Sequence, residues 1–554
     1  MGATKKNLIL GASLGNCVHV AGILNFLKLA QRSGYETLFL GPAVSVARIS
    51  EAVKKHNPHI IAISYRLTPE VLKKLLDDLR SAIQKHGWEK KTFVFGGTPP
   101  TAEVARQSKI FEAVFGGHET LEEITSFLRG KVEKTKKSDI PPQTLIERIE
   151  HTGPFPLLRH HFGLPTVKET VKGAKEIALS ETVDILSIGP DQNAQESFFR
   201  PEEMKKGQDG AGGVPLRKPE DLESIYQATR CGNHPLLRCY SGTRDLIQWA
   251  EMSLKTINIA WGAVPLCWYN RLDGRSARSP EESIRENQQA MKWYGKHGIP
   301  LEVNEAHHWS LRDAPDTVAV TAAFLAAYNA KTAGVKHYVA QYMFNTPAQI
   351  SPLMDLAKML AKIELIESLH DENFTTIRQT RTGLASLSPH PDRAKGQLSS
   401  SCVFQLSTEP RIIHVVGFSE GDHAATPSDI IESMNITRGV IDNYFLGSPR
   451  ILADPKIQER KEELVEEAKL LLNAIQNLLP DKHEDPWTDP KNLSRAIQVG
   501  LLDAPHLAGN EYAAGKITTQ IKNGACLTID PDSGKLLSEK ERISRIYTAA
   551  KTKK

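Results

Sequence analysis

Short apolar runs alternate with amphipathic segments along the first 130 residues of the chain. The apolar runs lie at residues 7–10, 36–41, 59–64, 92–97 and 112–117. The segments between them, such as 21–33 and 69–86, repeat apolar residues at the helical period. Continuous apolar strands separated by helices are typical of a parallel sheet that is covered on both faces. We therefore predict a doubly wound, Rossmann-like α/β domain over residues 1–130.

The middle of the chain repeats this alternation over a longer stretch. Eight further candidate strands lie at residues 156–163, 183–189, 236–242, 256–262, 300–306, 337–343, 374–380 and 411–417. Helical patterns such as 280–297 and 316–332 separate them. Eight strand–helix units predict a (β/α)₈ TIM barrel over residues 151–450, with its chemistry at the carboxyl ends of the strands.

Two segments outside these domains have a different character. Residues 131–142 are charged and end in two prolines, so residues 131–150 are expected to form a linker. Residues 451–554 are expected to form a helical and small α/β extension. The mixed charges of its helix 456–479 favour packing on the barrel or a dimer contact over membrane binding.

Composition excludes several classes of protein. The formal net charge of +4 is small for 554 residues, and the basic runs at 134–137 and 551–554 are isolated, so no nucleic-acid partner is expected. No apolar stretch approaches the roughly 20 residues of a membrane span. The cysteines form no CxxC pair, which disfavours a zinc ribbon or a disulfide framework. We expect a cytoplasmic enzyme with reduced thiols and a small-molecule substrate, and we leave open whether it is a homodimer.

A histidine follows the first predicted strand, in the stretch GNCVHVAG at residues 15–22. In an open α/β sheet, ligands gather at the carboxyl ends of strands, so the ring of His19 is placed to meet a ligand. From these residues alone, a loop or helix-capping role for His19 is favoured.

Further motifs favour a ligand-binding role for His19 over a loop or helix-capping role. The motif residues are His19 with Gly22, Ser64 after the third strand, and the pairs Gly96-Gly97 and Gly116-Gly117. In these residues the first domain resembles the cobalamin-binding domain of the glutamate mutase and methylmalonyl mutase group. The family pattern is Asp-x-His-x-x-Gly, then Ser-x-Leu, then Gly-Gly. Two positions depart from it, because Cys17 replaces the aspartate and Arg66 replaces the leucine.

The resemblance implies a role for each matching residue. His19 would be the lower cobalt ligand, and the nucleotide tail of the cofactor would enter the sheet beside Ser64, where Gly22, Gly96, Gly97 and Gly117 allow close approach. The family aspartate orients the ligating ring, and Cys17 accepts a hydrogen bond poorly, so ligation by His19 is weakened or is supported by Asn16. A different nucleotide-bearing cofactor, or none, is the alternative.

The barrel segment adds to the resemblance. The stretches 183–191, 241–245, 261–343, 411–429, 500–505 and 511–516 resemble, in order, the catalytic epsilon chain of glutamate mutase. This resemblance implies an adenosylcobalamin-dependent radical isomerase, a carbon-skeleton mutase whose cofactor domain and catalytic barrel are fused. A corrinoid methyl-transfer protein and a non-catalytic cobalamin carrier or sensor are the alternatives. Glu420 and the ordered barrel favour catalysis, whereas Cys17 and Val416 favour the alternatives.

The same comparison assigns candidate residues in the barrel. The three arginines with which the family grips its substrate fall on His161, Gln195 and Tyr240, so glutamate is expected to be a poor substrate. Nearby arginines that could replace them are Arg159, Arg238 and Arg244.

Three further residues are assigned to the cofactor. Glu420 matches the glutamate that holds the adenosyl ribose, while Val416 replaces its companion lysine. Gly163 and Asp209 are expected beside the cofactor. Residues 210–213 are expected to form a turn or a close approach to the cofactor. His307 and His308 are expected to line a cleft rather than bind a metal.

Overall fold

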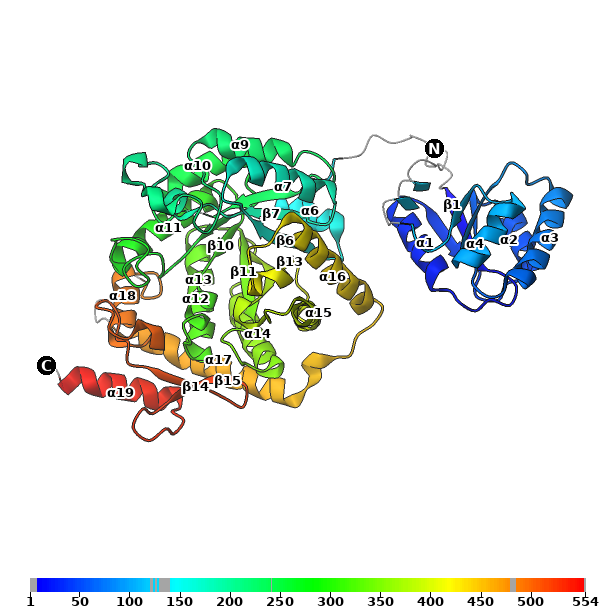
Figure 1. Ribbon diagram of the computed structural model, residues 1–554. Coiled ribbons are helices and arrows are strands. Elements are labelled where there is room, and N and C mark those ends of the chain that lie inside the picture. Colours follow the sequence, from blue (N-terminus) through cyan, green and yellow to red (C-terminus); the bar gives the residue numbers. More distant parts are fainter. Residues whose placement is uncertain are drawn as a thin grey trace. The chain divides into compact units, whose positions relative to one another are not determined.

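The computed structural model describes residues 7–119, 123–124, 127–128, 140–240, 242–478 and 485–552. The chain divides into two compact units, Met1–Asp139 and Ile140–Lys554, each described here by itself (Figure 1). Residues 131–139 of the expected linker, including the basic run 134–137, lie outside the described residues, as does Ser241 of the stretch 241–245.

The first unit is the predicted doubly wound domain. Its parallel sheet has the order β2-β1-β3-β4-β5. The strands are β1 (Leu8–Ser13), β2 (Glu36–Phe39), β3 (Ile60–Tyr65), β4 (Thr92–Gly97) and β5 (Ala113–Phe115). The helices are α1 (Ala21–Arg32), α2 (Val46–His56), α3 (Pro69–His86) and α4 (Pro99–Ser108). Apolar residues of the strands pack against α1 on one face and against α2, α3 and α4 on the other, which confirms a sheet covered on both sides.

The second unit is an eight-stranded parallel barrel that is nearly closed, as predicted. The sheet order is β8-β7-β6-β13-β12-β11-β10-β9, and the amide of Ala260, two residues before β9, donates to the carbonyl of Leu237 in β8 (2.9 Å). The strands are β6 (Leu157–Phe162), β7 (Ile185–Ile188), β8 (Leu236–Cys239), β9 (Gly262–Val264), β10 (Leu301–Val303), β11 (His337–Phe344), β12 (Thr375–Thr382) and β13 (Ile412–His414).

Helices surround this barrel and follow the individual strands (Figure 1). They are α6 (Leu145–Thr152), α7 (Val167–Leu179), α8 (Gln192–Ser197), α9 (Pro219–Ala228), α10 (Leu246–Ile257), α11 (Pro280–Lys296), α12 (Ala306–Ser310), α13 (Asp316–Thr332), α14 (Pro352–Glu367), α15 (Pro391–Leu406) and α16 (Pro427–Phe445). Short 3₁₀ helices are η1 (Pro201–Glu203), η2 (Lys206–Gln208), η3 (Leu384–Ser386), η4 (Phe418–Gly421), η5 (Ile451–Ala453) and η6 (Pro505–Leu507). None of the described helices combines the length and apolar character that a bilayer crossing needs.

Two element boundaries differ from the prediction. The predicted strand 256–262 is wrong, because α10 runs to Ile257, Asn258 ends it in the left-handed conformation (φ 45°), and β9 starts only at Gly262. Ile257 and Ile259 belong to the core between helices and barrel, so their apolar character reflects helix packing. Residues 145–152, expected partly as linker, form α6, whose Leu145 packs against the apolar layer inside the barrel.

The C-terminal extension packs on the barrel helices. It comprises α17 (Pro455–Gln476), α18 (Pro490–Val499), the antiparallel pair β14 (Thr518–Lys522) and β15 (Ala525–Ile529), and α19 (Glu539–Thr552). Apolar residues of α17 and α18 join the same core as α13 and α14. The extension and the barrel therefore form one body.

A buried ion cluster joins the extension to the barrel. The Nζ atom of Lys358, on α14, lies 3.1 Å from Asp355 and 3.4 Å from Asp316 of α13, and it donates to the carbonyl of Thr346 (2.6 Å). The three charged side chains are at most 1% exposed. Asp316 also accepts from the amide of Cys526 in β15 (3.1 Å). Arg460 of α17 lies 3.9 Å from Asp316 as well, so Lys358 is the closest counter-charge of both carboxylates at the point where the hairpin docks.

We expect Lys358→Met to lower the free energy of unfolding by about 3–5 kcal/mol, because it leaves the buried Asp355 without an ion-pair partner and Asp316 with only the more distant Arg460. Urea denaturation followed by tryptophan fluorescence measures the loss. Lys395→Met is the matched control, since Lys395 pairs with Glu432 at the surface (2.6 Å), where an ion pair contributes about 0–1 kcal/mol. Equal losses for the two variants would contradict a stabilising role for the buried cluster.

Candidate functional site

The loop between β1 and α1 presents His19 to solvent. Its Nδ1 atom lies 3.8 Å from the sulfur of Cys17, which is fully buried, and its carbonyl accepts from the Ser13 hydroxyl (3.4 Å). The Ser13 hydrogen bond joins the loop to the end of β1, and Cys17 packs into the core beside the sheet. Because Nδ1 faces the cysteine, Nε2 on the other side of the ring is the nitrogen available to a ligand.

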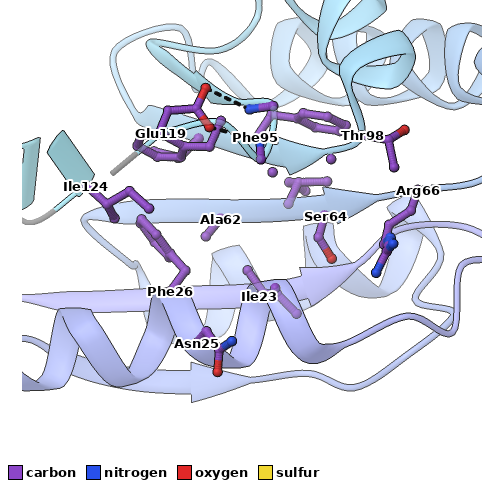
Figure 2. Close-up of a pocket in the computed structure, with 18 of the residues that line it drawn as sticks. Ile23, Asn25, Phe26, Ala62, Ser64, Arg66, Phe95, Thr98, Glu119 and Ile124 are labelled. Carbon is purple, nitrogen blue, oxygen red and sulfur yellow. Dashed lines mark hydrogen bonds between the residues drawn. The ribbon is translucent and has the colours of Figure 1, made fainter. Parts of the chain in front are cut away.

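A cavity of about 500 Å³ lies next to this loop. Figure 2 shows Ile23 and Phe26 of α1 beside Ala62 and Ser64 of β3 in its wall. The structure brings together in this cavity all the residues that the sequence assigned to the cofactor in the first unit, namely His19, Gly22, Ser64, Gly96, Gly97 and Gly117. Sequence reasoning missed the apolar walls of the cavity, because Phe26, Phe95 and Phe115 follow an ordinary core pattern.

Two observations show that the cavity suits a bulky ligand with polar atoms. The Ser64 hydroxyl is buried and has no hydrogen-bond partner among the described residues, which is costly unless a ligand supplies one. A Cβ atom added at Gly22 or Gly96 would meet no atom within 4 Å, so these glycines border open space. The residues present therefore fit a ligand that fills the cavity beside Ser64.

Gly97 has a different role from its neighbour. A Cβ atom there would lie 2.7 Å from the carbonyl of Tyr65 and 2.4 Å from the Thr101 hydroxyl. That hydroxyl donates to the Tyr65 carbonyl (3.1 Å), and the amide of Thr98 donates to it (2.9 Å) at the start of α4. Gly97 therefore allows α4 to pack closely on the strand, although it also lines the cavity.

Beyond β5, a glycine pair presents amides to a carboxylate. The amides of Gly116 and Gly117 each donate to Glu119 at 2.9 Å, and Gly117 has a left-handed φ of 92° (Figure 2). Burial tends to raise the pKa of Glu119, but the backbone hydrogen bonds outweigh it and the pKa is lowered. Glu119 is therefore an ionised carboxylate at neutral pH.

The comparisons with known proteins bear on this first unit. Residues 7–125 match the family model of the B12 binding domain. We call this segment the B12-binding domain. The match spans the loop of His19 and every strand that contributes to the cavity, so the family and the geometry point to the same place. No curated protein matches the chain.

Solved structures offer only distant likeness. A novel cobalamin-binding protein from Desulfitobacterium hafniense is 25% identical over 20% of this chain and 52% of that chain, about half its length, with a TM-score of 0.18. The second structure is OxsB, a cobalamin-dependent S-adenosylmethionine radical enzyme, with aqua-cobalamin bound. Its sequence is 12% identical to this chain, the match covers 90% of this chain and 76% of that chain, and the TM-score is 0.21. At such low TM-scores, the function of the barrel has to be argued from its own residues.

The barrel has a second, polar cavity of about 310 Å³ at the carboxyl ends of its strands. It is lined by Gln192, Gln195, Tyr240, Tyr269, Arg275, Asn304, His307, His308, Leu311, Gln341 and Arg381. Two of the three predicted substrate positions, Gln195 and Tyr240, are among them. The third, His161, has its Nε2 atom 2.9 Å from the Tyr240 hydroxyl, and the two rings stack with centroids 4.9 Å apart. The structure thus brings the three positions together.

The alternative arginines do not line this cavity. Arg159 and Arg238 are fully buried in the barrel interior, where each lies about 3.5 Å from the carboxylate of Glu302 (3.5 Å and 3.4 Å). Arg244 pairs with Glu203 outside the cavity.

Sequence reasoning missed the two arginines that do line the cavity, Arg275 and Arg381. Arg381 lies in β12, which extends to Thr382, two residues beyond the predicted strand end. The alternation of Gln379 and Arg381 on the inward face of the strand was the sequence signal that could have extended β12 to Arg381.

The histidines around the cavity are neutral. Burial lowers the pKa of His307 to about 3, with a further contribution from Arg381. Burial also lowers the pKa of His161, His308 and His414, again with nearby arginines adding to the effect. These imidazoles therefore act as hydrogen-bonding groups at neutral pH, as His307 does with Gln341 (3.0 Å). His307 and His308 line a cleft, as expected.

The other predicted residues have partners within the protein. Glu420, in η4, accepts from the amide of Gly417 (2.9 Å) and lies 3.1 Å from Nε2 of His160. Burial tends to raise the pKa of Glu420, but the His160 and Gly417 contacts outweigh it, so the pKa is lowered. The part that Glu420 plays toward the adenosyl ribose stays a prediction.

Gly163 and Asp209 serve the packing of the barrel loops. A Cβ atom at Gly163 would lie 2.4 Å from the carbonyl of Gly189, so this glycine allows two loops to touch. Asp209 is exposed, accepts from Asn193 (2.8 Å) and pairs with Arg217, which also binds the buried Asp191. Their assignment to the cofactor likewise stays a prediction.

We expect Gly96→Val to weaken cobalamin binding and leave the fold intact, because its methyl groups enter open space that the ligand needs. Overpacking costs about 1–3 kcal/mol, so the Kd should rise about tenfold. Absorbance titration with hydroxocobalamin measures the change.

Cobinamide, which lacks the nucleotide tail, is the control ligand and should bind the variant and the parent equally. Gly97→Val should instead lower the melting temperature, since its Cβ meets the backbone of Tyr65. Equal weakening of both ligands by Gly96→Val would show that the tail does not enter the cavity.

Proposed function

We propose that the protein is an adenosylcobalamin-dependent radical isomerase, a carbon-skeleton mutase related to glutamate mutase, with a substrate other than glutamate. The observation that supports this most directly is the pairing, in one chain, of a B12-binding domain with a barrel that has a polar cavity at its catalytic face. A carrier or sensor would need the first of these features and not the second.

In the B12-binding domain, His19 would hold the cobalt through Nε2, and Ser64 would bind the nucleotide tail in the 500 Å³ cavity. Adenosylcobalamin supplies a cobalt–carbon bond whose homolytic cleavage starts radical chemistry. The sulfur of Cys17, 3.8 Å from Nδ1, positions the ring without the strong acceptor that a carboxylate would provide.

In the barrel, the cavity residues bind and orient the substrate and limit the access of water to it. His161 and Tyr240 form a fixed, uncharged pair that presents a hydroxyl at the cavity wall, and Gln195 is held by a hydrogen bond to the carbonyl of Pro190 (2.8 Å). Uncharged groups at these three positions form weaker hydrogen bonds to a carboxylate than arginines would. This is why glutamate is not the expected substrate.

His19 ligation has a spectroscopic test. Electron paramagnetic resonance of the cob(II)alamin complex should change its nitrogen splitting when the protein is labelled with nitrogen-15 histidine. His19→Ala should remove that dependence on labelling and leave the fold unchanged, since the ring is exposed. A nitrogen splitting that is the same with and without nitrogen-15 histidine would rule out a histidine ligand.

The isomerase assignment itself is tested by following the transfer of tritium from the cofactor to the substrate. The full chain, loaded with adenosylcobalamin tritiated at the 5′ carbon, should transfer tritium to a substrate when candidate carboxylic acids are supplied. Glu420→Ala should weaken adenosylcobalamin binding, since a hydrogen bond to a charged group contributes about 1.5–3 kcal/mol.

Hydroxocobalamin is the control cofactor, and its binding should not change in Glu420→Ala. Glu420→Gln, which keeps an acceptor for the Gly417 amide, separates a structural role from ribose binding. Methyl transfer from methylcobalamin without tritium exchange would overturn the proposal.

A further inference from the structure

The barrel interior has more buried positive than negative charge. Arg159 and Arg238 share the single carboxylate of Glu302, which is also bound by the Trp261 indole (2.8 Å). Arg238 is fully buried, and none of its three guanidinium nitrogens has a hydrogen-bond partner among the described residues. Burial and the neighbouring Arg238 lower the pKa of Arg159 to about 9, which still leaves it charged at neutral pH.

The other buried acid near the cavity, Glu305, does not balance this charge. Its carboxylate accepts from the amides of Leu266 and Cys267 (2.9 Å each) and from the Trp309 indole (2.8 Å). Burial raises its pKa. No arginine lies within ion-pair distance of Glu305 among the described residues.

Arg381 adds a cation at the cavity wall itself. Its Nε atom is buried without a hydrogen-bond partner, and no described acid lies within ion-pair distance of its guanidinium. Leaving a partly buried guanidinium unpaired is unfavourable unless a ligand supplies the anion. Arg275, the second arginine of the cavity, is different, because Asp273 lies 3.6 Å from it and the Tyr269 ring lies beneath it.

The remaining lining residues offer hydrogen bonds but no negative charge. They are amides, phenols, neutral imidazoles and one leucine, and no carboxylate lines the cavity among the described residues. A substrate ammonium group would therefore face Arg381 without a counter-charge. A hydroxyl group, by contrast, can bind to Gln195, Asn304 or Gln341.

We propose that this cavity takes a small carboxylic acid that has no ammonium group, and that Arg381 binds its carboxylate. The proposal rests on the barrel cavity being the substrate site of the proposed isomerase. It narrows the substrate to unsubstituted or hydroxylated acids and assigns recognition to an arginine outside the three positions that the family resemblance supplied. Guanidinium matches carboxylate through two parallel hydrogen bonds, which also fixes the orientation of the acid.

The test compares three ligands with the same carbon chain. Glutarate, 2-hydroxyglutarate and glutamate differ only in the group at the second carbon, which is hydrogen, hydroxyl or ammonium. Calorimetric titration of the full-length protein should give a Kd for 2-hydroxyglutarate or glutarate at least about tenfold below that for glutamate. Glutamate binding as tightly as both, no binding of any of the three, or tighter binding of inorganic phosphate would overturn the proposal.

Two arginine variants locate the binding group. Arg381→Gln should raise the Kd of the preferred acid about tenfold, the loss expected for a charge-assisted hydrogen bond, and Arg381→Lys should restore part of it. Arg244→Gln is the matched control, because Arg244 pairs with Glu203 and does not line the cavity. An unchanged Kd in Arg381→Gln would overturn the role of Arg381.

These titrations need no cobalamin. Failure of tritium exchange would therefore leave the acid-binding result standing, and failure of acid binding would leave the isomerase reaction to be tested with other substrates. Melting temperatures of the variants exclude loss of folding as the cause of weaker binding.

Discussion

Parallel pairing of strands is the constraint on which both candidate sites depend. Parallel strands end at the same edge of a sheet, so residues far apart in the sequence meet wherever several strands stop. In the B12-binding domain this brings His19, Ser64 and Gly96 into one cavity from the ends of β1, β3 and β4. In the barrel the same rule places Tyr240, Asn304 and Arg381 in one cavity.

The two cavities differ in the physical property that defines them. The cavity of the B12-binding domain is a space shaped by missing side chains, with apolar walls and one buried hydroxyl that lacks a partner. The barrel cavity is defined by charge, since two arginines and no described carboxylate line it, while burial, with a further contribution from nearby arginines, lowers the pKa of the surrounding histidines. The first property suits a large cofactor tail, and the second suits a small anion.

Most of the fold was predictable, because the apolar runs and helical repeats are long and regular. Helices α3 and α13 occupy the expected residues, and the two parallel sheets agree with the repeated strand–helix units. The errors occur where an apolar run serves helix packing, as before β9, or where a polar residue continues a strand, as at Arg381 in β12. A hydrophobic pattern cannot separate these cases, since an inward-facing arginine inside a barrel looks like a surface residue.

The sequence by itself determined the two α/β units, the motif residues of the cofactor cavity and the absence of arginines at the three positions expected to hold the substrate. Those features depend on local pattern or on residue identity at a motif. Only the tertiary structure decided that Arg159 and Arg238 lie buried around Glu302, that Arg381 lines the cavity with its Nε atom unpartnered among the described residues, and that Gly96 borders open space while Gly97 touches backbone. Burial, pairing of charges and free volume arise from contacts between distant segments, and no local pattern of residues encodes them.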